Sequence, residues 1–312
     1  MTTGVGAGEA RAAKPLNNDA TSAASAGGRP LQSRAMSVGS TVDAIILDKT
    51  QSRNTKHLGQ RLAADGISAA AAGVLVAPVI TIIDRAIIEN ASGRNSLGTS
   101  MRDSMKTLLL RPHNFLFSTP FGLIFALYFG TYLAANTLDT ASSTLNSKPA
   151  STTTSGPTKF LATSTTNLSL CLYKDSRFTK LFGVAAPRAI PPASYALFAA
   201  RDCLTIFASF NVPPVIAPHL PMNAAVERYM SRASAAQFLA PAAVQAFSTP
   251  LHLLGLDLYN RNGGTPFLDR VKKVRADWFK STLARIGRIV PAFGVGGVVN
   301  NTVRSRMMKT LE

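Results

Sequence analysis

Long stretches without a fixed charge are the feature that most constrains how this chain can fold. Residues 66–83, 112–138 and 235–256 contain no Asp, Glu, Lys or Arg over 18, 27 and 22 residues. At a helical rise of about 1.5 Å per residue, such stretches approach the roughly 30 Å thickness of a bilayer core. Hydrophobic residues make up 46% of the chain and charged residues 16%, which is high for a soluble domain and modest for a membrane protein. These values predict an all-α membrane protein whose amphipathic helices surround a polar cavity.

Three further segments are weaker candidates for membrane spans. Residues 160–184 are free of charge only over 14 residues, and residues 188–211 carry Arg201 and Asp202 in their middle. Charges at that depth are costly unless they are paired or face a cavity, so this pair is either functional or near the membrane surface. Residues 281–306 form the last candidate. Asp84, directly after the first span, fits either an ion-pair network between helices or a solvated helix end.

The prolines suggest an internal repeat. Pro78 and Pro120 are 42 residues apart, and Pro250 and Pro291 are 41 apart, whereas the matching interval between Tyr173 and Pro191 is 18. Equal spacings of this size are the signature of a repeat architecture. The intervals predict three pseudo-repeats of two helices, with a shortened middle repeat that lacks a connector helix. Because proline removes a backbone donor and bends a helix, we expect kinks at five positions: Pro78, Pro120, Pro191, Pro250 and Pro291.

Positive charge alternates along the predicted topology. The connectors 94–112, 174–188 and 261–288 hold sixteen Lys and Arg residues, and the opposite loops 139–159 and 213–234 hold four. This asymmetry is the positive-inside pattern of multi-pass membrane proteins. It predicts that the connectors face the negatively charged compartment and that both termini lie on the other side.

Composition and motifs argue against other classes of function. The net charge of +17 permits nucleic-acid binding, but aromatic residues are only 7% and no zinc, RNA-stacking or helix-turn-helix pattern occurs, so we predict no nucleic-acid partner. Four histidines and two cysteines lack metal-ligand spacing, and we predict no metal site. No catalytic or phosphate-binding motif is present, so the sequence predicts neither an enzyme nor a cofactor.

The first 62 residues are rich in Ala, Ser, Gly and Thr, with arginines outnumbering acids, and are expected to be disordered. A cleaved targeting sequence and a plain tail both fit this composition. The predicted organisation is therefore a disordered segment (1–62), a first repeat (63–140), a flexible loop (141–157), a shortened second repeat (158–215), a loop (216–234) and a third repeat (235–308).

The stretch 235–306 resembles one repeat of the mitochondrial carrier family. It contains an apolar helix with Pro250 near its inner end, a basic amphipathic connector, and a second helix entered through Arg288-Ile289-Val290-Pro291. Odd helices of that family end in Pro-x-Asp/Glu-x-x-Lys/Arg. Residues 250–255 keep the proline and lose both charges, Ile80 occupies the acidic position of the first repeat, and Asp175 is the one acid retained, with Tyr173 in the place of the proline.

The resemblance implies six tilted helices around a water-filled cavity, with substrate contacts on the even helices. The equivalent substrate-binding positions are Phe117, Arg188 and Arg288, each three residues before its proline. Since guanidinium groups bind carboxylate and phosphate, two arginines in one cavity predict a small anionic solute. The alternative is that both arginines anchor helix ends at the membrane surface.

Two hypotheses for the function follow. The first is a divergent mitochondrial solute carrier in the inner mitochondrial membrane, with the lipid bilayer, including anionic lipid, as its other partner. The second is a carrier-like membrane protein without transport activity that serves as a scaffold, because the charged gate residues of the family are missing. Peroxisomal and outer mitochondrial membranes also fit this kind of fold.

Overall fold

The computed structural model describes residues 53–186, 188–223, 227–228, 231–261 and 264–312. These residues are 81% helical and contain no strand, which confirms the all-α prediction. The helices are α2 (Leu58–Ser92), α3 (Leu97–Leu110), α4 (Pro112–Leu116), α5 (Thr119–Leu145), α6 (Pro157–Phe182), α7 (Pro192–Phe210), α8 (Pro213–Ile216), the short η1 (Ala217–His219), α10 (Arg232–Asn260), α11 (Phe267–Gly287), η2 (Val290–Gly296) and α12 (Gly297–Lys309).

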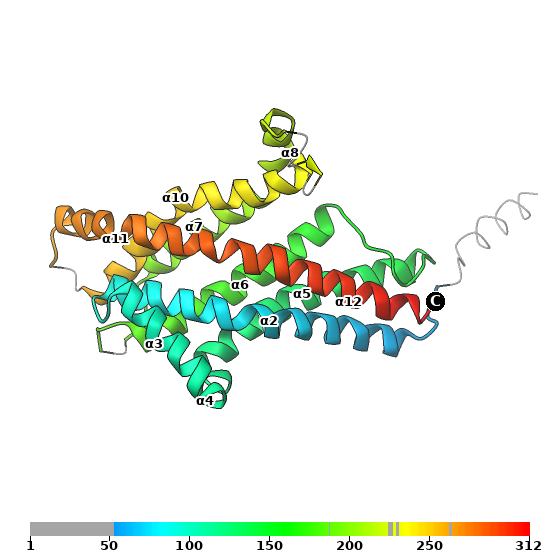
Figure 1. Ribbon diagram of the computed structural model, residues 1–312, viewed down its shortest axis with the longest axis horizontal. Coiled ribbons are helices and arrows are strands. Elements are labelled where there is room, and N and C mark those ends of the chain that lie inside the picture. Colours follow the sequence, from blue (N-terminus) through cyan, green and yellow to red (C-terminus); the bar gives the residue numbers. More distant parts are fainter. Residues whose placement is uncertain (1–52, 187, 224–226, 229–230, 262–263) are drawn as a thin grey trace, which may run out of the picture. The chain divides into compact units, whose positions relative to one another are not determined.

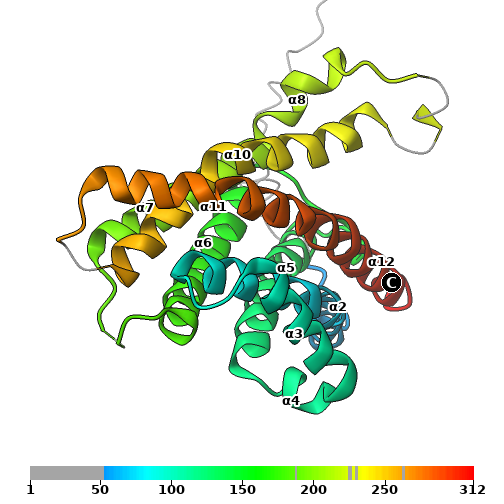
Figure 2. The same cartoon turned by 60° about the vertical axis from the view of Figure 1, so that its left-hand side comes forward.

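Helix α2 is the element around which the others pack. It contacts α5, α6, α10, α11 and α12, as well as the connector helix α3. In Figure 1, α2 and α12 run side by side although they lie at opposite ends of the described chain. Figure 2 shows the same bundle from another side, with α3 and α4 leaving it in one direction and the α8 segment in the other.

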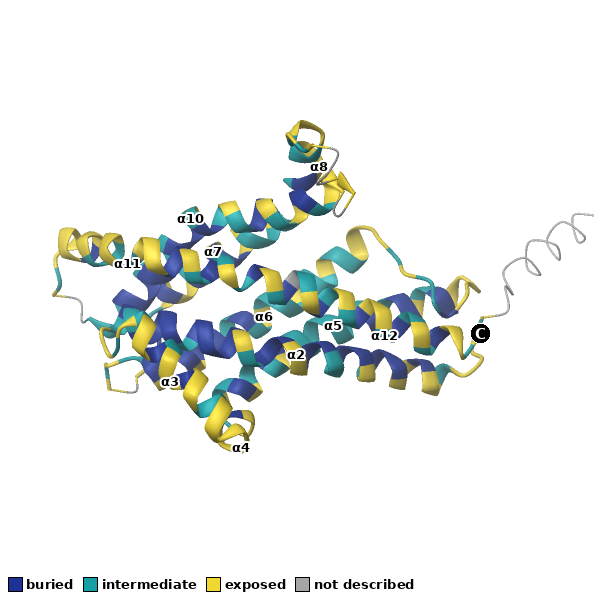
Figure 3. Ribbon diagram, in the orientation of Figure 1, coloured by how far each residue is buried: buried dark blue, intermediate teal, exposed yellow. Residues whose placement is uncertain are grey.

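Helix α2 buries charged and polar residues together with much of its apolar surface, and its exposed side chains are mostly apolar. Asp65, Ser68 and Asp84 are buried, whereas Leu75 and Val79 are exposed. Figure 3 shows buried and exposed residues alternating along this helix. A water-soluble helix buries its apolar stripe and exposes its charges. The pattern of α2 fits a helix whose outer face meets lipid and whose polar groups face the interior of a bundle.

Serine and proline residues mark where helices α3, α5 and α7 begin. The side chain of Ser96 accepts a hydrogen bond from the Thr99 amide at the start of α3, and Ser118 caps α5 in the same way. Pro120 lies in the first turn of α5, and Pro191 is the N-cap of α7. Proline is tolerated there because the first helical amides have no intrahelical acceptor. These two residues therefore stand at helix starts, where we had expected kinks.

The other three prolines lie within continuous helical segments. Pro78 lies inside α2, and Pro250 lies inside α10. Pro291 lies near the start of the π-helical η2, which joins α11 to α12. Gly296 ends this segment where an added Cβ would clash with the Tyr132 hydroxyl and lie 2.8 Å from Val76. A π segment widens the helix locally, and here it lies against α2 and α5.

A buried polar cluster, called the terminal cluster below, ties α12 to α2 and α5. Asp65 Oδ1 accepts a hydrogen bond from Arg304 Nε at 2.7 Å, and its Oδ2 accepts one from the Thr140 hydroxyl at 2.6 Å. The amides of Asn136 and Asn300 exchange two hydrogen bonds of 2.8 and 2.9 Å. The cluster consists of Asp65, Asn136, Thr140, Asn300 and Arg304, all buried.

Three helical segments of the described chain are long and apolar enough to cross a bilayer. They are Leu58–Ser92, Thr119–Leu145 and the continuous segment Phe267–Lys309. Helices α6 and α10 contain many Ser, Thr, Ala or charged residues and do not meet this criterion. Six spans in three repeats, like the domain boundaries drawn from them, stay a prediction.

Two of the predicted segments lie partly outside the described residues. The predicted N-terminal segment, 1–62, lies outside the described residues up to residue 52, and α2 already begins at Leu58. Between α6 and α7 the described residues form no connector helix, as the short middle interval suggested.

Candidate functional site

A buried charged cluster, called the central cluster below, links four helical segments. It lies towards the end of α2 that leads to α3, away from the terminal cluster. Its members are Asp84 on α2, Lys174 and Asp175 on α6, Arg201 and Asp202 on α7, and Arg288 directly after α11.

Ion pairs connect these residues into one chain. Asp84 Oδ2 lies 2.8 Å from Lys174 Nζ, and Asp84 Oδ1 lies 2.6 Å from Arg288 Nη1. Lys174 Nζ is also 2.5 Å from Asp175 Oδ1, whose other oxygen is 2.6 Å from Arg201 Nη2. Arg201 Nη2 then lies 2.5 Å from Asp202 Oδ1. Each carboxylate therefore has a cationic partner, and the partners come from different helices except within the adjacent pairs.

Burial makes this pairing necessary. The side chains of Lys174, Asp175 and Arg201 are at most 2% exposed, and only Arg288 reaches 20%. Moving an isolated charge out of water costs several kcal/mol, so buried charges persist where they are paired or serve a substrate path. Asp84 thus belongs to an ion-pair network between helices, which was one of the two interpretations of the sequence. Arg201 and Asp202 are likewise buried and paired inside the bundle.

Some polar atoms of the central cluster make no hydrogen bond within the described chain. Arg201 Nη1 and Asp202 Oδ2 are buried and have no hydrogen-bond partner among the described residues. A free donor on a guanidinium and a free acceptor on a carboxylate thus occur on neighbouring residues of α7. Buried polar groups without partners are rare in native proteins, and each one calls for an explanation.

A second polar group adjoins the cluster from α10 and α11. The guanidinium of Arg285 contacts Gln245 Oε1 at 2.9 Å and His252 Nδ1 at 3.0 Å. Within the described residues no carboxylate lies within ion-pair distance of Arg285. Its charge therefore adds to the central cluster without a counter-charge, and the region as a whole carries four cationic side chains against three carboxylates.

The structure separates the three predicted substrate-binding residues. Phe117 follows the connector helix α4 and is 90% exposed. Arg188 is exposed, stacks on the Tyr259 ring at 5.5 Å, and donates hydrogen bonds to the Leu258 and Tyr259 carbonyl groups at the end of α10. Of the three residues, Arg288 is the one that belongs to the central cluster, through its ion pair with Asp84.

Other members of the cluster were not assigned a role from the sequence. Lys174 was noted only as a charge that follows the third apolar stretch, and Arg285 only as one of the connector charges. His252 was noted only where an acidic position of the carrier motif is lost. The available signal was a charged or polar residue within an apolar helix, which in membrane proteins marks a functional position by default.

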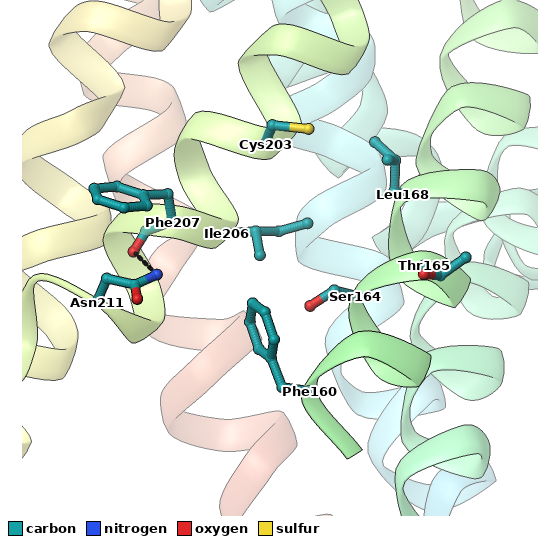
Figure 4. A pocket seen from close by; sticks show the side chains of 8 residues that line it. All are labelled: Phe160, Ser164, Thr165, Leu168, Cys203, Ile206, Phe207 and Asn211. Carbon is teal, nitrogen blue, oxygen red and sulfur yellow. Dashed lines mark hydrogen bonds between the residues drawn. The ribbon is translucent and has the colours of Figure 1, made fainter. Parts of the chain in front are cut away.

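An apolar pocket opens between α6 and α7, away from these charges. It has a cavity volume of about 310 Å³ and is lined almost entirely by apolar surface. Figure 4 shows Leu168 and Phe160 on one wall, and Cys203 and Phe207 on the other. A binding site for a polar solute needs convergent polar groups, which this pocket lacks. It matches a lipid-facing gap between two helices better than a substrate site. In the part of the chain that the structure describes, no group of His, Cys, Asp and Glu side chains could hold a metal ion.

Comparison with known proteins decides the family. The family model described as "probable citrulline exporter" matches residues 68–308, which is most of the chain. The chain belongs to this family. No curated protein matches it.

The assignment corrects the resemblance to the mitochondrial carrier family, which is wrong. The matching family is a different one, and no carrier-family match accompanies it. The prolines and small residues that suggested carriers are features that any tightly packed membrane bundle can use. The charged motif that distinguishes carriers was the part missing here, at Ile80 and His252.

Family membership also fixes the class of function. The protein is a transporter rather than an enzyme, and it moves a small metabolite across a lipid bilayer. Its helices are consistent with a multi-pass membrane location.

Proposed function

We propose that this protein exports citrulline or a closely related neutral amino acid, and that the central cluster is its substrate site. The observation that carries the proposal is the pair of free polar atoms on α7. Arg201 Nη1 is a buried donor and Asp202 Oδ2 a buried acceptor, and neither has a partner among the described residues.

An α-amino acid presents groups complementary to this pair. Its carboxylate accepts hydrogen bonds from a guanidinium, and its ammonium group donates to a carboxylate. Arg201 and Asp202 are already held by Asp175 and by each other, so both are oriented before a substrate arrives. A zwitterion adds one charge of each sign and leaves the balance of the cluster unchanged, which limits the cost of bringing it into a buried site.

The cluster also offers a way to couple binding to movement. Its ion pairs join α2, α6, α7 and the start of η2, so a substrate that engages α7 competes with contacts that hold four segments together. A ligand shifts a conformational equilibrium only by its differential affinity for the two states. Exchanging internal ion pairs for substrate contacts supplies such a difference.

One observation favours a second candidate, the anionic solute expected from the sequence. Because Arg285 has no carboxylate partner within the described residues, the region carries one more cation than carboxylates. A substrate with a net negative charge would balance this excess. The transport assay therefore includes a dicarboxylate beside the neutral amino acids.

We further propose the inner mitochondrial membrane as the location. Support comes from the first forty residues, in which four Lys and Arg outnumber two Asp and Glu, as in targeting sequences. Fusion of residues 1–62 to a reporter tests the targeting part: import into mitochondria supports it, and a reporter left outside contradicts it.

The direct experiment is uptake of labelled citrulline into proteoliposomes that contain the purified protein. We expect saturable uptake that unlabelled citrulline inhibits and that Arg201→Gln lowers about tenfold or more, as expected for losing a charge-assisted contact in a buried site. Lys272→Gln on the exposed face of α11 is the matched control, because its side chain is 80% exposed. Uptake of a dicarboxylate alone would favour the anion candidate. Folded protein without uptake of any solute would favour the transport-inactive scaffold.

A further inference from the structure

His252 on α10 carries a hydrogen-bond donor whose position the neighbouring residues fix. Its Nδ1 lies 3.0 Å from Arg285 Nη1. A guanidinium has only donors, so Nδ1 must accept this hydrogen bond, and the imidazole proton of the neutral ring is on Nε2. His252 is buried, and its Nε2 has no hydrogen-bond partner among the described residues.

Arg285 is itself held in place. Its Nε donates to Gln245 Oε1 at 2.9 Å, and the Gln245 amide nitrogen donates to the Pro241 carbonyl oxygen at 2.9 Å. This series of bonds starts at the backbone of α10 and ends at the imidazole ring. It fixes the ring orientation and the tautomer, in the way that outer residues orient a functional histidine. The free N–H is therefore a placed donor rather than one that can turn to another acceptor.

The Phe198 side chain of α7 contacts both the His252 ring and the Arg201 guanidinium. The centroid of the Phe198 ring is 5.4 Å from the centroid of the His252 ring and 6.0 Å from the guanidinium carbon of Arg201. Helices α7 and α10 approach closely here because Gly255 has no Cβ: an added one would lie 2.6 Å from Phe198 Cε1. Arg201 and His252 thus both lie against the Phe198 ring. Among the described residues, each of the two has one unpaired buried nitrogen atom, and Asp202 next to Arg201 has an unpaired oxygen.

We infer that His252 is a specificity-determining residue, whose Nε2–H donates to the side-chain carbonyl oxygen of a neutral amino acid bound at Arg201 and Asp202. The inference rests on the proposed function and names the substrate class of the same site: amino acids with a ureido or carboxamide group. The intervening methylene groups pack along Phe198. The unbalanced charge of Arg285 beside His252 disfavours amino acids whose side chain is cationic.

Three amino acids with the same five-carbon skeleton test this recognition. Norvaline has no polar side-chain group, ornithine has a terminal ammonium group, and citrulline has a terminal ureido group. A site built to hydrogen-bond a substrate group discriminates against an analogue that lacks it, because the buried donor is then left unpaired. We expect the wild-type protein to prefer citrulline to norvaline about tenfold or more, and to prefer norvaline to ornithine.

Two substitutions of His252 separate its two nitrogen atoms. His252→Asn keeps an acceptor near the position of Nδ1 for Arg285 and loses the distal donor. His252→Gln reaches the position of Nε2 with an amide donor and loses the acceptor for Arg285. The preference for citrulline over norvaline is measured by competition uptake assays and by binding to the purified protein. His252→Asn should lower this preference about tenfold, whereas His252→Gln should retain most of it.

Each other outcome contradicts a definite part of the account. If His252→Asn keeps the preference for citrulline over norvaline and His252→Gln loses it, His252 serves only as the acceptor for Arg285, and the inference is wrong. Wild-type protein that transports citrulline and norvaline equally well also overturns the inference and leaves the proposed function standing, even if neither variant folds. Wild-type protein that neither binds nor transports citrulline overturns the proposed function and this inference together.

Discussion

Two buried polar clusters lie on the same helix, and they differ in how completely their groups are paired. Asp65 of the terminal cluster and Asp84 of the central cluster are both buried on α2. At a rise of about 1.5 Å per residue they are about 28 Å apart along the helix, close to the thickness of a bilayer core. Each cluster joins α2 to a segment at the far end of the chain, through Arg304 or Arg288.

We propose from this difference that the terminal cluster holds the bundle together and that the central cluster binds the substrate. Among the described residues, no buried polar atom of the five terminal-cluster side chains lacks a partner, whereas Nε of the adjoining Arg61 does. In the described chain, the central cluster leaves Arg201 Nη1 and Asp202 Oδ2 unpaired. The His252 ring, whose Nε2 is also unpaired there, contacts Phe198 as the Arg201 guanidinium does. A fully satisfied network stabilises and specifies a packing arrangement. A network that keeps placed donors and acceptors free is arranged for a ligand.

The largest effect on stability is expected for Asp65→Ala. Asp65 is the one carboxylate among the described residues that pairs with Arg304, which then stays buried, and breaking such a pair costs about 3–5 kcal/mol of the free energy of unfolding. Asp175→Ala should cost less, because Lys174 keeps Asp84 and Arg201 keeps Asp202. Unfolding in mixed detergent micelles measures both variants. Equal losses, or a larger loss for Asp175→Ala, would contradict the comparison.

The largest effect on transport from a single central substitution is expected for Asp84→Asn. Asp84 pairs with both Lys174 and Arg288. The neutral asparagine side chain removes the charged partner of Arg288 and one of the two charged partners of Lys174. Citrulline uptake per folded molecule should fall about 30-fold or more, since removing one partner of buried charge pairs costs about 2–5 kcal/mol and about 1.4 kcal/mol corresponds to tenfold. Asn136→Ala in the terminal cluster is the comparison variant, and uptake that falls equally in both would argue against separate roles.

Arg188 and Arg288 allow a finer comparison, since both were predicted to bind substrate. We expect Arg288→Ala to lower uptake about tenfold, because Arg288 contacts Asp84. Arg188→Ala should lower it less and cost about 0.3–1 kcal/mol of stability, since a cation at a helix C-terminus contributes about that much. Kinetics of citrulline uptake at several concentrations distinguish the two. A greater loss with Arg188→Ala would place the substrate path at the end of α10.

The smallest effect on the rate of transport is expected for Gly255→Ala. The added methyl group would contact Phe198, which must shift between α7 and α10, and overpacking of this kind costs about 1–3 kcal/mol. Because Phe198 lies beside His252 and Arg201, the preference for citrulline over norvaline should also weaken. Gly287→Ala is the control, because nothing lies within 4 Å of its added Cβ. An unchanged preference in Gly255→Ala would separate Phe198 from substrate recognition.

Much of the helical organisation could be predicted from the sequence. Charge-free stretches located α2, α5 and α10, because lipid-facing segments exclude charge over a length that the bilayer sets. The family could not be predicted in this way: paired prolines and small residues serve packing in many membrane bundles, so their spacing misidentified the chain as carrier-like.

The candidate site was predicted only in outline. Asp84, Arg201 and Asp202 could be singled out because their charge interrupts an apolar helix. The partners are set by helix rotation and packing, which one sequence does not reveal. Lys174 and Arg285 therefore looked like connector charges, although both are buried in the structure.

The most direct test replaces one ion pair in each cluster by apolar side chains of similar size and measures citrulline uptake. The variants are Asp65→Leu with Arg304→Met, and Asp175→Leu with Arg201→Met and Asp202→Asn, because Asp202 pairs with Arg201 and would otherwise keep a buried charge. Replacing a whole buried pair is often neutral for stability, so both proteins should fold. The account predicts that the terminal variant keeps most of its uptake and that the central variant loses it. Uptake retained by a folded central variant, or lost only in a folded terminal variant, would contradict the assignment of the substrate site.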